Sequence, residues 1–178
     1  MHAGHNTMRM ASLCGMVALR LGIPAERCAL IRTASLLHDI GKLAIPSRIL
    51  RKAGPLTPDE RKEVEEHTTL GHRILRGSGS EMIRVAADMA LTHHERYDGK
   101  GYPQGLAGEQ IPLEGRIAAV CDVYDALTAS RPYRPLPFTR EEAIRMIREE
   151  RGRAFDPEVV DALLESLDLV DAIERYAA

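Results

Sequence analysis

The sequence predicts an all-α protein, a single bundle of about seven helices. Apolar residues recur at spacings of three and four along most of the chain, which is the period of a helix with one buried face. Gly and Pro separate these stretches, and no segment shows the apolar–polar alternation of a half-buried strand. Because 178 residues suffice for one domain with a proper core, we assign residues 1–178 to one domain. Its helix-like start is compatible with a domain of a longer regulatory protein.

Two helices are predicted before residue 41. The first covers residues 6–21, and Gly22 and Pro24 mark its end. Its buried face comprises Met10, Leu13, Cys14, Val17 and Leu21. The second runs from about Ala25 to His38, and Gly41 breaks it. One side of it carries Leu30, Ile31, Ala34, Leu37 and His38. Residues 44–55 are expected to form a connecting loop.

Two more helices are predicted between residues 57 and 93. The run 57–60 is a capping box with Pro at the first helical position, so it begins a helix. The inner stripe of that helix is Val64, His67, Gly71, Ile74 and Leu75. Residues 77–80 form a break, and the next helix begins near Met82. Its inner face presents Met82, Ala86, Met89, Ala90 and His93.

The last three helices follow a long loop. Residues 98–112 are too rich in Gly and Pro for regular structure, and a connector of this length is often functional. Residues 113–128 are again helical. A second capping box at 139–142 begins the sixth helix, and Asp156 caps the seventh. That helix carries Val160, Leu163, Leu164 and Leu167.

The composition excludes several classes of protein. With 24 basic and 26 acidic residues the net charge is −2, which argues against a surface that coats nucleic acid, so we expect neither DNA nor RNA as a partner. The three cysteines, Cys14, Cys28 and Cys121, show no C-x-x-C spacing and are expected to be buried, reduced residues. No stretch approaches the roughly 20 apolar residues that span a bilayer, and no signal peptide is present. We therefore expect a cytoplasmic protein.

Side chains of the types that bind metals in proteins lie along the predicted apolar stripes or next to them. They occur at four places: the pair at 38–39, residue 67, the pair at 93–94, and Asp122. Burying so many ionisable groups is costly unless they are compensated, and divalent metals compensate imidazole and carboxylate. Each residue alone has an ordinary reading, since a single core histidine is more often hydrogen-bonded than metal-bound. Together they predict a central metal site, whereas His72 faces off the stripe and is expected at the surface.

With these residues in place, the chain resembles the HD-GYP domains, a branch of the HD-domain metal-dependent phosphohydrolases. The resemblance covers almost the whole chain, and its motifs follow in the family's order. They are His38-Asp39-Ile40-Gly41-Lys42, Ile45-Pro46, Leu56-Thr57-Pro58, His67 with Gly71, His93-His94-Glu95, Asp98-Gly99-Lys100-Gly101-Tyr102-Pro103, Asp122-Val123-Tyr124-Asp125-Ala126-Leu127-Thr128, Arg131-Pro132-Tyr133-Arg134, and Gly152 with Phe155-Asp156-Pro157.

The resemblance implies an HD-type helical bundle around two or three metal ions, usually iron or manganese, that hydrolyses cyclic di-GMP. Two metals about 3.5–4 Å apart can generate a hydroxide near neutral pH and stabilise the attacking and leaving oxygens. The products would be pGpG, GMP or both. By this resemblance Asp39 is the catalytic bridge between metals. The implied ligands are His38, Asp39, His67, His93, His94 and Asp122.

The same resemblance assigns the substrate contacts. Lys42, Arg131 and Arg134 match positions that hold the phosphates, and Lys42 is also a candidate for assisting the leaving oxygen. In the loop 98–103, glycines permit unusual backbone conformations and Tyr102 supplies a rigid aromatic ring. This loop is expected to shape the substrate entrance or to dock a partner such as a diguanylate cyclase domain.

The first helix departs from the family pattern. Members place a ligand His three residues before an Arg, which here falls on Asn6, and three-metal members place a Glu one turn earlier, which here falls on His2. Three outcomes stay open: His5 serves after a one-residue shift, His2 substitutes, or two metals bind without this helix. Asn is a poor ligand for iron or manganese, and the missing Glu favours two metals over three.

Three functions are therefore weighed. The first is an active cyclic di-GMP phosphodiesterase. The second is a catalytically weak sensor of cyclic di-GMP, or a module that docks a cyclase, which the altered first helix favours. The third is a phosphohydrolase of another cyclic dinucleotide. Turnover separates the first from the second, and a substrate panel separates the first from the third.

Overall fold

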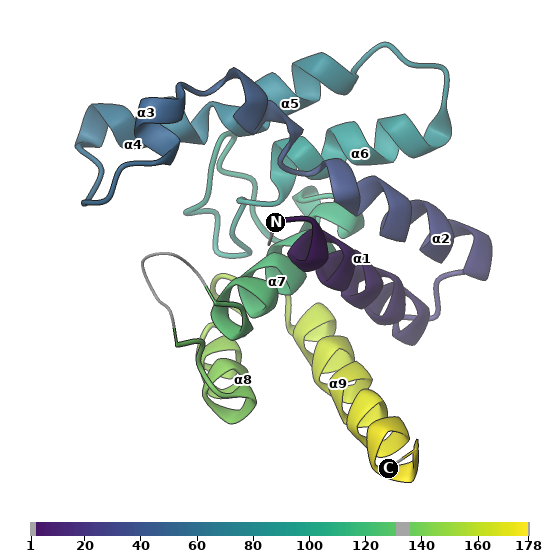
Figure 1. Cartoon of the computed structure of the whole chain (residues 1–178). Coiled ribbons are helices and arrows are strands. Elements are labelled where there is room, and N and C mark those ends of the chain that lie inside the picture. The colour runs from purple at the N-terminus through teal and green to yellow at the C-terminus, as the bar shows by residue number, and fades with distance from the viewer. Residues whose placement is uncertain (1–2, 131–135, 178) are drawn as a thin grey trace.

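The computed structural model describes residues 3–130 and 136–177, with side chains for 8–130 and 136–167, and this part of the chain is helical (Figure 1). No β-strand forms within it; only two isolated bridges occur. The α-helices are α1 (Ala3–Arg20), α2 (Ala25–Ala34), α3 (Ser47–Leu50), α4 (Pro58–Glu65), α5 (His67–Leu75), α6 (Glu81–Thr92), α7 (Leu113–Thr128), α8 (Arg140–Glu149) and α9 (Pro157–Ala177). Short 3₁₀ helices add η1 (Ser35–Leu37), η2 (Ile40–Ala44) and η3 (Gly108–Gln110). The all-α prediction is confirmed.

The α-helices of the described ranges exceed the predicted seven for two local reasons. α3 lies inside the expected loop 44–55, and its single buried apolar residue, Ile49, is too little for a periodic pattern. The helix predicted to run on from Pro58 is divided between α4 and α5. The imidazole of His67 and the hydroxyls of Thr68 and Thr69 bond carbonyls three residues back, and such local bonds compete with the helical ladder.

Two further expectations in these segments were wrong. Ile74 was placed on the inner stripe, but it lies in the last turn of α5 and is 54% exposed, because helical period fixes the direction of a side chain and not whether another element covers it. The second helix was expected to reach His38, but α2 ends at Ala34 and the chain tightens into η1. The Ser35 hydroxyl donates to the Arg32 carbonyl at 2.8 Å and so favours this early end.

Helix starts were predicted well. The capping boxes at Thr57 and Thr139 are both formed, with the threonine hydroxyl accepting from the backbone N–H three residues on. At the start of α9 the Asp156 carboxylate accepts from the Glu158 N–H at 2.9 Å. Its other oxygen lies 2.5 Å from the Arg116 guanidinium, so this buried acid also ties α9 to α7.

One apolar core joins α1, α2, α6, α7, α8 and α9, and α1 packs on α2, α7 and α9. Among its fully buried members are Met10, Val17, Ile31, Met89, Ile117, Val120, Ile147, Val160 and Leu163. The three cysteines are buried and free, as expected. Arg9 of α1 binds the buried Asp125 of α7 at 2.6 Å, which fixes the two helices in register at one end.

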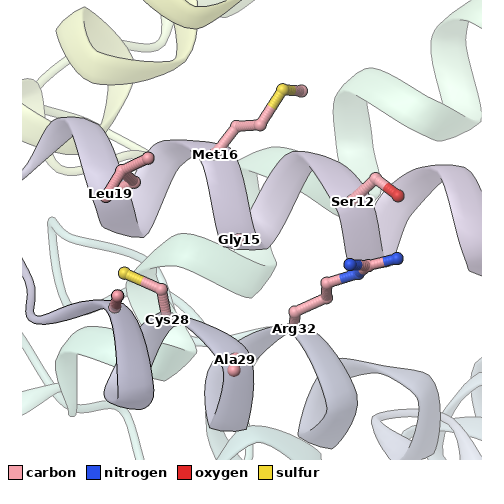
Figure 2. Close-up of a pocket in the computed structure, with 8 residues that line it drawn as sticks. Ser12, Gly15, Met16, Leu19, Cys28, Ala29 and Arg32 are labelled. Carbon is pink, nitrogen blue, oxygen red and sulfur yellow. The ribbon is translucent and has the colours of Figure 1, made fainter.

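The helices gather at two ends of the molecule. α3 to α6 lie together at one end and α8 and α9 at the other, with α1 and α7 between them (Figure 1). A mainly apolar groove of about 390 Å³ lies between α1 and α2 and is lined by Ser12, Gly15, Met16, Leu19, Cys28, Ala29 and Arg32 with Ala25 (Figure 2). None of the described site candidates lines it. No helix of the described chain is both long and apolar enough to cross a membrane.

Candidate metal centre

The predicted ligands come from four separate places in the fold, three of them at the ends of 3₁₀ or α-helices and one inside α7. His38 and Asp39 lie between η1 and η2, and His67 is the first residue of α5. His93 and His94 directly follow α6, and Asp122 lies in the middle of α7. Because α5 packs against both α6 and η2, these segments meet. The structure thus brings together side chains that are up to 84 positions apart, from His38 to Asp122, in the printed numbering.

Gly41 allows the closest of these approaches. A Cβ atom at this position would collide with the carbonyl oxygen of His67 and would lie 2.5 Å from the amide nitrogen of Gly71. The sequence predicted that Gly41 breaks a helix; in the structure it lies within η2 and has no positive φ. Its role is instead to let η2 lie directly on α5, which brings Asp39 next to His67.

Three imidazoles are held in the same way. The Nδ1 atoms of His38, His67 and His93 lie 2.7, 2.6 and 3.0 Å from the carbonyl oxygens of Ser35, Val64 and Met89. A carbonyl can only accept, so each Nδ1 carries the proton and donates. In a neutral ring this leaves Nε2 as a lone-pair donor, and a backbone partner on the far nitrogen is the usual support of a metal-bound histidine.

The Asp39 carboxylate lies at the centre of these rings. Its Oδ1 is 3.4 Å from His67 Nε2 and 3.8 Å from His93 Nε2, while its Oδ2 is 3.5 Å from His38 Nε2. Asp122 Oδ1 reaches His38 Nε2 at 3.8 Å. Asp39 Oδ1 is buried, and no donor among the described residues hydrogen-bonds it.

These residues fit divalent metal ions. A buried carboxylate oxygen facing imidazole lone pairs is unfavourable by itself, and a cation placed among them would satisfy all of these atoms. Two groups of three residues each have their ligand atoms within 4.8 Å of one another. The first group is His67, His93 and His94, and the second is His38, Asp39 and His93. The shared His93 shows that the groups adjoin. Asp122 belongs to neither group, but its Oδ1 lies 3.8 Å from His38 Nε2 of the second.

The protonation states agree with a ligand role. Burial lowers the pKa of His67 and of His93, and it lowers the pKa of His94 to about 3, so these rings are neutral near pH 7. Burial would raise the pKa of Asp39, but the neighbouring His38 and Lys42 lower it well below its ordinary value. Burial would lower the pKa of His38, yet Asp39 and Asp122 raise it to about 9. With this pKa the His38 ring is protonated on both nitrogens at pH 7, so it must release its Nε2 proton when it binds a metal ion.

Lys42 and Tyr102 border the centre. The Lys42 ammonium lies 2.5 Å from Asp39 Oδ2 and is 42% exposed, so it can face a ligand from the solvent side. The Tyr102 ring stacks on His94, with ring centroids 4.9 Å apart and planes 27° apart. The other predicted residues are not all visible: His2, Arg131 and Arg134 lie outside the described residues, as do the side chains of His5 and Asn6 in α1.

Two residues differ from the sequence reading. His72, expected at the surface, is half-buried, and its Nδ1 lies 3.2 Å from the Ala87 carbonyl oxygen of α6. His72 lies off the apolar stripe of α5 but still faces α6. Glu95 was given no role, although it is buried and its carboxylate accepts backbone N–H groups of the following loop. A carboxylate directly after two predicted ligands and before a Gly-rich loop was the available signal.

The comparison with known proteins agrees with this geometry. An HD domain family model matches residues 1–159. The chain belongs to the HD domain family. The HD domain described here is 50% identical, over 88% of its length and 41% of the relative's, to the cyclic di-GMP phosphodiesterase response regulator RpfG of Xanthomonas campestris. It is 41% identical, over 96% of its length and 32% of the relative's, to the 3'3'-cGAMP-specific phosphodiesterase 2 of Vibrio cholerae.

The HD domain therefore spans less than half the length of these relatives. Among solved structures, an HD-GYP protein of Bdellovibrio bacteriovorus has the same fold, with a TM-score of 0.70 over 92% of this chain and 52% of that chain at 18% identity. The fold and the resemblance to HD-GYP proteins drawn from the sequence are thus confirmed.

Proposed function

We propose that this HD domain hydrolyses cyclic di-GMP to pGpG, GMP or both, using two divalent metal ions, iron or manganese. The observation that carries the proposal is the buried Oδ1 of Asp39, which faces the Nε2 atoms of His67 and His93 without a hydrogen-bond donor from the described residues. An oxygen in this position is the natural bridge between the two adjoining groups of ligand atoms.

The ligands assigned to the metals are His38, Asp39, His67, His93, His94 and Asp122. Bound divalent ions supply Lewis acidity and a nucleophile near neutral pH, which phosphodiester hydrolysis requires. A third ion would need ligands from the first helix, where His2, His5 and Asn6 are the candidates.

The chain's own residues would bind and orient the substrate. Lys42 presents its ammonium beside Asp39, where a phosphate oxygen approaching the centre would meet it, and we propose that it protonates the departing oxygen. Tyr102 offers a ring and a hydroxyl at the rim, next to His94. Arg131 and Arg134 are proposed to neutralise the second phosphate of the ring, as the resemblance implies.

The identities of the relatives support the substrate class. One relative is named for cyclic di-GMP and another for 3'3'-cGAMP, and both substrates are cyclic dinucleotides with two phosphodiester bonds. The higher identity to the first favours cyclic di-GMP, so a different cyclic dinucleotide is the second candidate. A partner such as a diguanylate cyclase domain is proposed for the loop 98–103, because Lys100 and Pro103 are exposed beside Tyr102.

The test is turnover with counted metals. The protein is reconstituted anaerobically with Fe(II) or Mn(II), metals per chain are measured, and cyclic di-GMP and 3'3'-cGAMP are each supplied to the wild type and to Asp39→Ala. Linear product from cyclic di-GMP that the variant abolishes is the expected result. If the protein binds cyclic di-GMP tightly but forms no product with either Fe(II) or Mn(II), the proposal of an enzyme is wrong and the domain is a sensor.

A further inference from the structure

Glu95 is a buried acid with its own set of partners next to the candidate metal ligands. Its side chain is 3% exposed, and each of its two carboxylate oxygens accepts a backbone N–H of the loop that follows. Gln104 N lies 2.7 Å from Oε1, and Leu106 N lies 3.0 Å from Oε2. The carboxylate therefore holds the loop on the far side of Tyr102.

The near side of the loop is fixed by two further contacts. The Tyr102 N–H donates to the His94 carbonyl oxygen at 3.2 Å. Gly101 lies so close to the segment 94–96 that a Cβ atom would be 2.5 Å from Glu95 Cα and 2.6 Å from the His94 oxygen. Tyr102 is thus held between two anchors, one at His94 and Glu95 and the other at Gln104 and Leu106.

This arrangement keeps the Tyr102 ring stacked on the His94 imidazole. A tyrosine phenol is protonated at neutral pH, so the Tyr102 hydroxyl can donate a hydrogen bond to an anionic substrate.

We propose that Glu95 is a positioning residue, which holds the loop so that Tyr102 stays on His94 and donates to the substrate phosphate. The proposal rests on the proposed function for its substrate. Glu95 acts through Tyr102 and not on the metals, so its contribution to substrate binding disappears when Tyr102 is absent.

The decisive variant is Glu95→Gln. An amide keeps the side-chain shape but offers one acceptor oxygen, and its NH₂ group would face the second backbone N–H. One of the two loop bonds is therefore lost, and the loop is released on the side of Gln104 or Leu106. The matched control is Asp156→Asn, an equally buried carboxylate at 3% exposure that accepts a backbone N–H at the start of α9.

The experiment is a double-mutant cycle on the manganese-loaded protein. We measure KM and kcat for cyclic di-GMP in the wild type, Glu95→Gln, Tyr102→Ala and the double variant. We expect Glu95→Gln to raise KM about ten-fold with kcat little changed, and to have almost no effect in the Tyr102→Ala background. Asp156→Asn should leave KM unchanged in both backgrounds.

Additive effects on KM would overturn the proposal, because Glu95 would then act independently of Tyr102. A lower manganese stoichiometry in Glu95→Gln would also overturn it, since the effect would then lie at the ligands. If Glu95→Gln does not fold, Glu95→Asp, which keeps both oxygens on a shorter side chain, is carried through the same cycle.

A substrate-free measurement separates this proposal from the proposed function. The chain has five tyrosines, so ring signals of isotope-labelled tyrosine can be assigned with Tyr102→Phe. In the metal-free wild type the Tyr102 ring protons should be shifted by the ring current of His94. Glu95→Gln should abolish this shift and Asp156→Asn should keep it. A shift that survives in Glu95→Gln overturns the positioning role, whether or not the protein turns over any cyclic dinucleotide.

Discussion

The apolar core and the candidate metal centre are both buried, but they are stabilised in opposite ways. The core consists of residues such as Val17, Ile117 and Leu163, which gain free energy simply by leaving water. Where charge enters it, as at Asp125, a guanidinium from another helix compensates it. The centre instead collects imidazoles around a carboxylate whose Oδ1 has no donor among the described residues.

This difference separates the region that stabilises the fold from the region to which we assign the proposed chemistry. Leaving a buried polar group unsatisfied costs about 1–3 kcal/mol, so the centre lowers the stability of the metal-free protein. The core must supply that free energy. We therefore expect the two regions to respond differently to substitution, with activity and stability changing separately.

The largest expected effect is on activity at the centre. Asp39→Ala should reduce turnover of cyclic di-GMP to background, because it removes the carboxylate that forms one ligand group with His38 and His93. The free energy of unfolding without metal should change by no more than about 1 kcal/mol, since the lost contacts with Lys42 and His38 are offset by removal of the unsatisfied Oδ1. Product formation and urea unfolding of the same preparation measure both quantities. A large loss of metal-free stability would contradict the comparison.

The converse substitution lies in the core. Leu163→Ala in α9 removes a fully buried side chain and should lower the free energy of unfolding by about 2–5 kcal/mol. Turnover per folded molecule should be kept at temperatures where the variant is folded, because no candidate ligand belongs to α9. Chemical denaturation followed by circular dichroism gives the first value, and an assay at low temperature gives the second. Full stability in Leu163→Ala would show that the core is not what supports the centre.

Bound metal should make the centre stabilise the folded state, as the core does. A ligand that binds only the folded state stabilises it by about 2.7 kcal/mol at a hundred-fold excess over its Kd. Mn(II) should therefore raise the Tm of the wild type and of Leu163→Ala, and it should raise the Tm of Asp39→Ala much less. Thermal unfolding with and without a chelator provides the measurement. Equal stabilisation of all three proteins would place the metal elsewhere.

The sequence predicted the two regions unequally for physical reasons. Core residues such as Leu163 and Val160 were found because helical period alone fixes which face is buried. His38, His67 and His93 were found as polar interruptions of those faces. Their distances could not be predicted, because these depend on the contact of Gly41 with α5 and on the break between α4 and α5, which the local bonds of His67, Thr68 and Thr69 create.

The errors follow from the same limits. Ile74 was placed inward from the helical period, which does not show whether another element covers the last turn of α5. The short helix α3 was missed because four residues are too few to show a period. Glu95 had no pattern of its own, since its partners are backbone N–H groups, which every sequence contains. The centre itself was anticipated because several ligand-type residues together are far more informative than any one.

A smaller effect is expected where charge enters the core. Arg9→Met should lower the free energy of unfolding by about 1–3 kcal/mol, because it leaves the buried Asp125 carboxylate without the Arg9 guanidinium at 2.6 Å. Because the Arg9 side chain is 45% exposed, solvent weakens the ion pair, and we expect a loss in the lower part of that range. The double variant Arg9→Met with Asp125→Leu should recover much of the loss. Denaturant unfolding of the wild type, Arg9→Met, Asp125→Leu and the double variant measures the coupling. Strictly additive losses in the free energy of unfolding would contradict a paired charge.

The smallest expected effect lies outside both regions. Thr139→Ala removes the hydroxyl that accepts from the Glu142 N–H at 3.2 Å at the start of α8, and it should lower the free energy of unfolding by about 1 kcal/mol. Thr139→Ser keeps the acceptor and should restore most of the stability. Neither variant should change KM or kcat for cyclic di-GMP, because α8 contributes no candidate ligand. A change in KM would mean that α8 reaches the substrate, and the division of the molecule into a core that folds and a centre that reacts would then be too simple.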